Sequence, residues 1–235
     1  MKMTIGLDRC LSFINCQLQA PPAPAAHCGG IKCVTVSRES GCGAHVFAEH
    51  LAARLQAHLP HGTPPWTIFD RSLVEAVLQD HHLPARLAAF MPEDKVWQLN
   101  DIVEDLFSLH PPTETLVRQT AETILRLAQL GNVIILGRGG NIITERLPGV
   151  LHVRLIGSVE LRMAHLQSFD KFSKKDAKAR MKREDGGRRR YLKRYFRQDV
   201  ADPLHYHLVI NTDLVTLGQA AAMVEDLALN RSASE

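Results

Sequence analysis

The stretch IKCVTVSRESGCGAHVFAEH, residues 31–50, decides the fold of this chain. It begins with the β-rich run KCVTVS at 32–37, passes through Gly41 and Gly43, and continues as a helical pattern from Ala44. A strand that runs through a glycine-rich turn into a helix presents backbone N–H groups and a helix N-terminus to an anion. The two glycines are equally consistent with a tight strand-to-helix turn that binds nothing, and the stretch alone does not separate the two interpretations.

The same stretch departs from the common phosphate-binding motif G-x-x-x-x-G-K-[ST], the Walker A loop. Gly43 matches the second glycine of the motif, whereas Arg38 stands at the first. Ala44 replaces the lysine, and His45 replaces the hydroxyl residue. The sequence therefore predicts a degenerate Walker A loop, without the lysine charge that normally accompanies a transferring phosphoryl group.

The rest of the chain alternates between short β-rich runs and longer helical patterns. The further runs are WTIFD at 66–70, NVIILG at 132–137, VLHVRLIG at 150–157 and HLVINT at 207–212. This alternation predicts an α/β fold in which a parallel sheet is covered by helices on both faces. Capping patterns predict helix starts at Ser173 and Thr216, and Gly186-Gly187 predicts a break between two helices.

Length and composition indicate one main domain, with room for a smaller mobile subdomain. The chain has 235 residues, of which 45% are hydrophobic and 23% charged. No run approaches the ~20 apolar residues of a membrane span. Asp8 and Arg9 interrupt the apolar N-terminal portion, which argues against a signal peptide. We expect residues 1–30 to form a variable helix and a Pro/Ala linker, and residues 31–235 to form the domain.

Cysteine usage favours a reducing compartment. All five cysteines lie between Cys10 and Cys42 without a C-x-x-C pair. This argues against a disulfide framework and a thiolate metal site, and it predicts a cytoplasmic protein. Cys42 is interpreted as filling a small position in the glycine loop rather than as an oxidation-sensitive thiol. The histidines show no metal-ligand spacing, so no metal-ligating residues are predicted.

The positive charge of the chain is concentrated in one segment. Residues 171–197 hold thirteen Lys or Arg against three acidic residues, a net charge of about +10 in a chain whose total is +3. Such a run is most often a solvated helix face. Nucleic-acid binding is a weaker alternative, because the interleaved Tyr191, Tyr195 and Phe196 have the spacing of one buried helix face.

Five motifs in order resemble the cytidylate kinase-like family of P-loop kinases, which is related to the nucleoside monophosphate kinases. The motifs are VSRESGCGAHVFAEHLAARL, FDRSLVEAV, NVIILGRGGNII, LHVRLIGSVELRM and DGGRRRYLKRYFRQDVADPLHYHLVINTD. The resemblance implies a three-layer fold with about five parallel strands in the order 2-3-1-4-5. It also implies an acceptor-binding insertion at about 71–112 and a basic helical lid at about 170–200.

The resemblance implies a role for two groups of residues around the donor. Backbone N–H groups of the glycine loop would cradle the phosphates of ATP. The lid would supply arginines that neutralise charge as the phosphoryl group moves, and it would exclude water. The loop residues are Ser40, Gly41, Cys42, Gly43, Ala44 and His45, and the lid residues are Arg183, Asp185 and Arg188.

The acceptor side is implied by residues that follow two strands. Arg138 matches an arginine that holds the acceptor's phosphate, but Gly139 stands where cytidylate kinases carry an acidic residue that touches the sugar. Asp70 and Arg71 would face the acceptor cleft. A helix-capping pair is an equally good interpretation of these last two residues.

These features together predict transfer of the ATP γ-phosphoryl group to a small phosphorylated acceptor. A nucleoside monophosphate such as CMP is the first candidate, with Mg²⁺ bridging donor oxygens. The alternative is a catalytically inactive, kinase-shaped protein that binds a phosphorylated ligand or nucleic acid. Ala44 and Gly139 favour this alternative.

Overall fold

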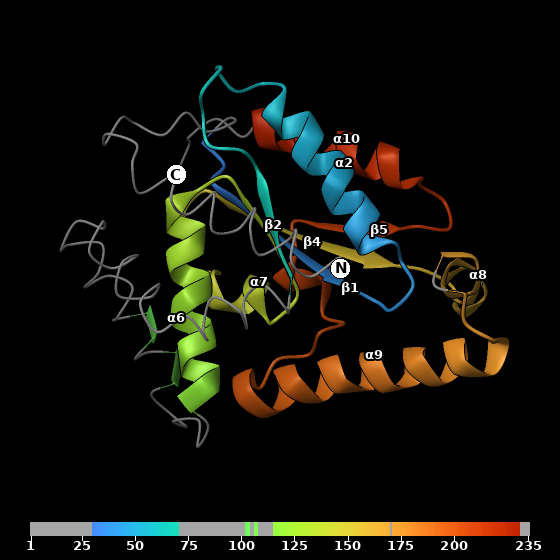
Figure 1. Ribbon diagram of the computed structural model, residues 1–235. Helices are drawn as coiled ribbons and strands as arrows, with labels where there is room; N and C mark the ends of the chain where they lie inside the picture. Colours follow the sequence, from blue (N-terminus) through green and yellow to red (C-terminus); the bar gives the residue numbers. More distant parts are fainter. Residues whose placement is uncertain (1–29, 71–101, 104–105, 108–114, 170, 231–235) are drawn as a thin grey trace.

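The computed structural model describes residues 30–70, 102–103, 106–107, 115–169 and 171–230 (Figure 1). The N-terminal helix and linker expected before residue 30 lie outside these residues. So does most of the insertion expected at 71–112.

A five-stranded parallel sheet forms the centre of the fold. Its strands are β1 (Cys33–Arg38), β2 (Thr67–Phe69), β3 (Val133–Leu136), β4 (Val150–Ile156) and β5 (Leu208–Asn211). They pair in parallel in the order β2-β3-β1-β4-β5, which confirms the predicted order. β1 therefore lies between β3 and β4, and the carboxyl ends of all strands meet at one edge of the sheet.

Helices cover both faces of this sheet, so the predicted three-layer architecture is confirmed (Figure 1). One face carries α2 (Ala44–Gln56) and α10 (Leu217–Asn230), which pack on the side chains of Val34 and Val36. The other face carries α6 (Thr115–Leu130), α7 (Gly140–Ile143) and the end of α9 (Lys174–Phe196). The chain also forms α8 (Val159–Phe169) and the 3₁₀ turn η1 (Pro203–His205).

The expected break of the basic segment at Gly186-Gly187 is wrong. α9 is one helix of 23 residues, and neither glycine has a positive φ. Its two ends are held by burial, Met181 against α8 and Leu192 and Phe196 in the main core. Tertiary packing at both ends thus outweighs the low helix propensity of two central glycines.

The two predicted helix caps are confirmed. The Ser173 hydroxyl accepts a hydrogen bond from the Asp176 N–H at 3.2 Å, at the start of α9. Before α10, the Gln219 N–H donates to Thr216 Oγ1 at 3.3 Å, while the Thr216 N–H donates to Gln219 Oε1 at 3.1 Å. This reciprocal pair is a capping box.

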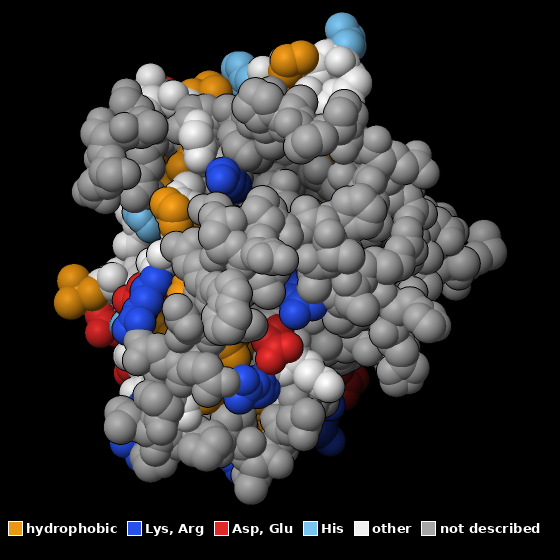
Figure 2. Space-filling model, turned by 90° about the vertical axis from the view of Figure 1, so that its left-hand side faces the viewer, with side chains coloured by type: hydrophobic (Ala, Val, Ile, Leu, Met, Phe, Trp, Pro, Cys, Tyr) orange, Lys and Arg blue, Asp and Glu red, His pale blue; other side chains and the backbone are white. Residues whose placement is uncertain are grey.

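On the face drawn in Figure 2, the described side chains are of several types. Among the described side chains there, those of Lys and Arg alternate with acidic and hydrophobic ones. None of the helices within the described residues combines the length and the apolar composition that a membrane span requires.

Continuity of α9 predicts that Gly187→Ala stabilises the protein. A Cβ at Gly187 meets nothing within 4 Å, and its backbone is helical. Because alanine is the better helix former, we expect the free energy of unfolding to rise by about 0.5–1 kcal/mol in chemical denaturation. The matched variant Gly43→Ala should destabilise, since Gly43 has φ 70° and its Cβ would lie 2.6 Å from Leu217 Cδ1. A loss of stability in Gly187→Ala would contradict a continuous helix.

Candidate active site

A cavity of about 820 Å³ opens at the carboxyl edge of the sheet. The glycine loop after β1, the turn after β3 and the inner side of α9 form its walls. The predicted site residues that line it are Ser40, Gly41, Cys42, Gly43, Ala44, His45, Asp70, Arg138, Arg183 and Arg188. Asp185 contacts the same loop from α9, and Arg71 lies outside the described residues.

Both glycines of the loop are required by close packing. Gly41 has φ 91°, and a Cβ there would lie 2.4 Å from the carbonyl oxygen of Arg162. Gly43 has φ 70° and directly precedes the first residue of α2. The loop therefore turns sharply into α2, and Ala44 and His45 in the first turn of this helix face the cavity.

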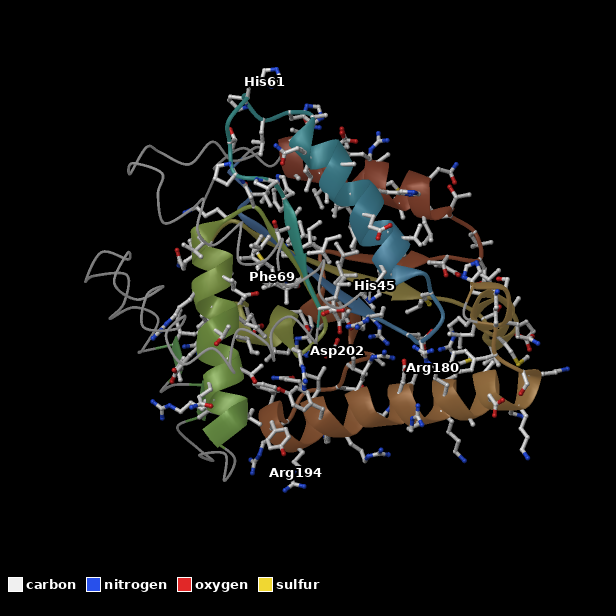
Figure 3. All side chains as sticks on the ribbon, viewed as in Figure 1. His45, His61, Phe69, Arg180, Arg194 and Asp202 are labelled. Carbon is white, nitrogen blue, oxygen red and sulfur yellow. The ribbon has the colours of Figure 1, made fainter. Side chains whose placement is uncertain are left out.

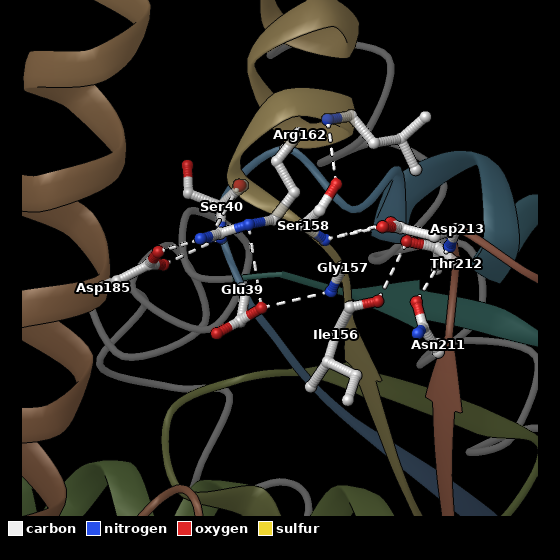
Figure 4. A network of polar contacts seen from close by, with 12 residues as sticks. Glu39, Ser40, Ile156, Gly157, Ser158, Arg162, Asp185, Asn211, Thr212 and Asp213 are labelled. Carbon is white, nitrogen blue, oxygen red and sulfur yellow. Dashed lines mark hydrogen bonds and ion pairs between the residues drawn. The ribbon is translucent and has the colours of Figure 1, made fainter.

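A network of ion pairs joins the loop to α8 and α9 (Figure 4). The Ser40 N–H donates to Asp185 Oδ1 at 2.8 Å, and Arg162 Nη1 donates to Asp185 Oδ2 at 2.6 Å. Arg162 also lies 3.7 Å from the carboxylate of Glu39, and it donates to the Ser40 carbonyl at 3.3 Å. Only 8% of the Arg162 side chain is exposed, so its charge depends on these carboxylates.

Glu184 forms a second link between the loop and α9. Its carboxylate accepts hydrogen bonds from Ser40 Oγ at 2.8 Å, Arg180 Nε at 2.7 Å and Arg188 Nη2 at 3.0 Å. Figure 3 shows Arg180 on the side of α9 that faces the sheet, and Arg194 on the opposite side. Burial by itself raises the pKa of Glu184, but the bonds from Arg180 and Ser40 outweigh it, and the pKa lies below its ordinary value.

These contacts pair two predicted lid residues, Arg188 and Asp185, with each other, and Asp185 also with the glycine loop. Arg188 donates to Asp185 Oδ1 at 2.8 Å as well as to Glu184, so its guanidinium is paired within its own helix. Asp185 meanwhile accepts from the Ser40 N–H, a group that the sequence assigned to a donor phosphate. In this conformation two carboxylates occupy the place of an anion on the loop.

The turn after β3 holds Arg138 in an unusual backbone conformation. Gly137, Arg138 and Gly139 have φ values of 79°, 57° and 71°, three successive residues in the left-handed region. A non-glycine residue there costs of order 1 kcal/mol. A Cβ at Gly139 would lie 3.0 Å from Leu192 Cδ2, so α9 packs directly on the turn. The surrounding structure thus fixes Arg138 at the cavity wall.

Two further predicted residues of the loop differ in environment. Cys42 is buried, and burial raises the pKa of its thiol to about 11, so it stays protonated at neutral pH. This agrees with the interpretation that it fills a small position. His45 is 61% exposed, and its Nε2 lies 4.0 Å from Asp70 Oδ2 across the cavity mouth.

Comparison with known proteins settles the family. The model of the cytidylate kinase-like family matches residues 33–214, most of the chain. The chain belongs to the cytidylate kinase-like family. Every motif of the site described above lies within the matched residues. No curated protein matches the sequence at a significant level.

One solved structure supports the fold of this family member. An uncharacterized protein from Eubacterium ventriosum has a TM-score of 0.64 at 18% identity, over 84% of this chain and 97% of that one. A shikimate kinase from Bacteroides thetaiotaomicron has a TM-score of 0.43 at 11% identity, over 83% and 97% of the two chains. Family membership supports a nucleotide kinase-like function.

Sequence reasoning missed three residues that organise the site. Arg162 and Glu39 lie within the motifs that carried the resemblance, and Glu184 directly precedes the last of these motifs, but none of the three was assigned a role. The partners of Arg162 lie on other elements, since it reaches Ser40 and Asp185 from α8. Glu184 likewise reaches Ser40 from α9. No local sequence pattern around the buried arginine of α8 predicts which residues it pairs with.

The network predicts that Asp185→Ala destabilises the fold. Its removal leaves the Arg162 guanidinium short of its nearest carboxylate in a buried place. We expect the free energy of unfolding to fall by about 2–3 kcal/mol in urea denaturation. Glu49 is an exposed acid on α2, so Glu49→Ala is the control and should change stability by less than about 0.5 kcal/mol. Equal stability of both variants would contradict a structural role for the Asp185 ion pair.

The lowered pKa of Glu184 predicts a pH dependence with a definite sign. Its ionised form is stabilised in the folded state, so the stability it contributes is present above its ordinary pKa of 4.5 and lost as pH falls below it. Glu184→Gln should therefore lower the melting temperature at pH 7 and reduce its fall below pH 4.5. Glu225 has a lowered pKa of the same sign, so the wild-type slope should be weakened rather than abolished. An unchanged slope in Glu184→Gln would argue against this pairing.

Proposed function

We propose that this protein transfers the γ-phosphoryl group of ATP to a small phosphorylated acceptor, with a nucleoside monophosphate such as CMP as the first candidate. One observation carries the proposal. Arginines from three separate elements line one cavity together with a glycine loop at a helix N-terminus. These arginines are Arg38, Arg138, Arg180, Arg183 and Arg188. Phosphoryl transfer depends mainly on positioned charge of this kind.

The donor side of the cavity is assigned to the glycine loop and α9. Backbone N–H groups of Ser40, Gly41, Gly43 and His45 would bind donor phosphates at the N-terminus of α2. Asp185 would then give up the Ser40 N–H. Arg188 would turn from its carboxylate partners to the phosphates, which it could grip through two N–H groups. The paired state keeps the arginine beside the place where it is needed.

The acceptor side is assigned to the opposite wall. Asp70 follows β2 and Arg138 follows β3, so both lie at the carboxyl edge where open α/β sheets bind ligands. Arg138 would hold the acceptor's phosphate, as the family resemblance implies. Gly139 packs against Leu192 and leaves no side chain for a sugar contact, so the nucleoside would be recognised elsewhere.

ATP and Mg²⁺ fit the groups that line the cavity. Its volume is in the range of small-molecule sites, and the carboxylates of Glu39 and Asp70 are hard oxygen donors of the kind Mg²⁺ prefers. Mg²⁺ takes several ligands from water and substrate phosphates, so few protein ligands are required. When bound, the ion would neutralise charge on donor oxygens. The chain's own task would be to orient both substrates and exclude water.

A second candidate function is binding without turnover. It is favoured by Ala44 at the lysine position and by the pairing of Arg188 with Glu184 and Asp185. A protein of this kind would report a phosphorylated ligand or a nucleic acid. Nucleic-acid affinity would fall steeply with salt, whereas turnover would require Mg²⁺ and consume ATP.

The test is ADP formation with each common nucleoside monophosphate, in the presence and absence of Mg²⁺. We expect Mg²⁺-dependent turnover with at least one acceptor, and a fall of kcat by roughly 100-fold or more in Arg188→Ala. Arg189→Ala is the matched control, because Arg189 is exposed on α9 and does not line the cavity. It should retain wild-type turnover.

Two outcomes would count against the proposal. Unchanged kcat in Arg188→Ala would remove α9 from the reaction. ATP binding without ADP formation for any acceptor would favour the binding function. Calorimetry of ATP on the same samples separates the second outcome from loss of binding.

A further inference from the structure

Arg38 has no assigned individual role, although its position in the chain and in the cavity suggests one. It ends β1 and occupies the place of the first glycine of the Walker A motif. Its side chain lies directly on Gly137, because a Cβ at Gly137 would come within 2.0 Å of Arg38 Nη1. The guanidinium therefore extends from β1 to the turn that carries Arg138, and it lines the cavity.

The direction of this side chain separates it from the donor loop. β1 lies between β3 and β4 in the sheet. Ser40 and Gly41, two and three residues further along, pack against Arg162 of α8 on the β4 side. Arg38 points instead to the β3 side, where Arg138 and Asp70 lie at the cavity wall. One short loop thus presents its backbone to one side and an arginine to the other.

Among the residues that the structure describes, the Arg38 guanidinium lacks the carboxylate partner that the neighbouring arginines have. Arg162, Arg180 and Arg188 each donate to Asp185 or Glu184. Within the described residues, no hydrogen bond or ion pair involves the Arg38 guanidinium. Burial, followed by the charge of Arg188, lowers the pKa of Arg38 to about 10, against the opposing effects of Glu184 and Asp70. A cation in such a place is stabilised by an added anion.

We propose that Arg38 binds the phosphate group of the acceptor, gripping it together with Arg138 of the adjacent turn. The identification of the bound phosphate with that of an acceptor rests on the proposed phosphotransferase function. The anion site itself rests on geometry. The ligand class is a phosphate monoester dianion. Two guanidinium groups from neighbouring strand ends match its two negative charges, and each can donate two N–H groups to its oxygens.

Gly137 fits this assignment. Its φ of 79° disfavours any side chain at this position, and a Cβ there would displace the Arg38 guanidinium. Without a Cβ there, the guanidinium of Arg38 comes close to the backbone that leads into Arg138. The arginine at the first position of the loop and the glycine before Arg138 therefore form one unit, contributed by two strands.

The experiment compares wild type with Arg38→Ala, Arg38→Lys and the control Arg189→Ala. Steady-state kinetics should show the KM of the acceptor raised about tenfold to 100-fold in Arg38→Ala, with the KM of ATP changed less than about twofold. Arg38→Lys keeps the positive charge but loses the planar guanidinium with its paired N–H donors. Its acceptor KM should therefore lie between those of wild type and Arg38→Ala. Arg189→Ala should match wild type. Thermal unfolding of each variant checks that the fold is intact.

Binding of inorganic phosphate, measured by calorimetry, tests the site without turnover. We expect wild type and Arg189→Ala to bind phosphate equally, and Arg38→Ala to bind it about tenfold or more weakly. Phosphate binding that depends on Arg38 in a protein that forms no ADP would support the anion site and contradict the proposed phosphoryl transfer.

Four results would overturn the inference. The first is equal phosphate affinity in Arg38→Ala and wild type. The second is a rise in the KM of ATP alone, which would place Arg38 on the donor. The third is the absence of phosphate binding by wild type. Turnover that persists with an unchanged acceptor KM in Arg38→Ala would leave the phosphotransferase function standing while removing Arg38 from it.

Discussion

The carboxylate of Asp185 holds three parts of the molecule in register. It accepts from the backbone of the glycine loop, from Arg162 on α8 and from Arg188 on its own helix. Arg162 is almost fully buried, and an unpaired charge there would be costly. The position of α9 over the sheet is thus tied to the conformation of the loop. The glycine loop and α9 form two walls of the cavity, and this carboxylate joins them.

Much of the fold could be predicted from the sequence because its signals are local. Each strand is a short apolar run, and the alternation of such runs with helices restricts the sheet to parallel pairing. The strand order came from the resemblance, and the pairing of β1 with both β3 and β4 confirms it. The caps at Ser173 and Thr216 were also predictable, since the cap and its partner are three residues apart.

Most features that the sequence did not reveal depend on tertiary contacts, although the pairing of Arg188 with Glu184 is local. Gly186-Gly187 is a helix breaker by propensity, yet burial of Met181 and Leu192 on either side carries α9 through it. The proposed role of Arg188 was inferred from its motif, but its present pairing with Glu184 was not. Candidate residues from four of the five motifs nevertheless line one cavity, because the carboxyl ends of parallel strands meet at the same edge.

The net charge of a segment also differs from the charge that faces a ligand in the cavity. Residues 171–197 carry about +10, but on the inner side of α9 Glu184 and Asp185 pair with Arg180 and Arg188. The lysines at the start of α9 are exposed, where water screens them. Composition therefore overstates the positive field inside the cavity, and geometry decides which arginines face a ligand.

The hydrogen bond between the loop and Asp185 affects the free energy of ligand binding. A phosphate that binds the Ser40 N–H replaces a carboxylate that already accepts from it, so the N–H group has an anionic acceptor before and after the exchange. Asp185 retains Arg162 as a partner when it leaves Ser40, because the two bonds use different oxygens of its carboxylate. The loop and α9 are thus held in a binding geometry before the ligand arrives, and less ordering remains to be done at binding. An acidic residue inside a basic helix is consistent with an anion site for this reason: it orients the arginines and satisfies them in the absence of phosphate.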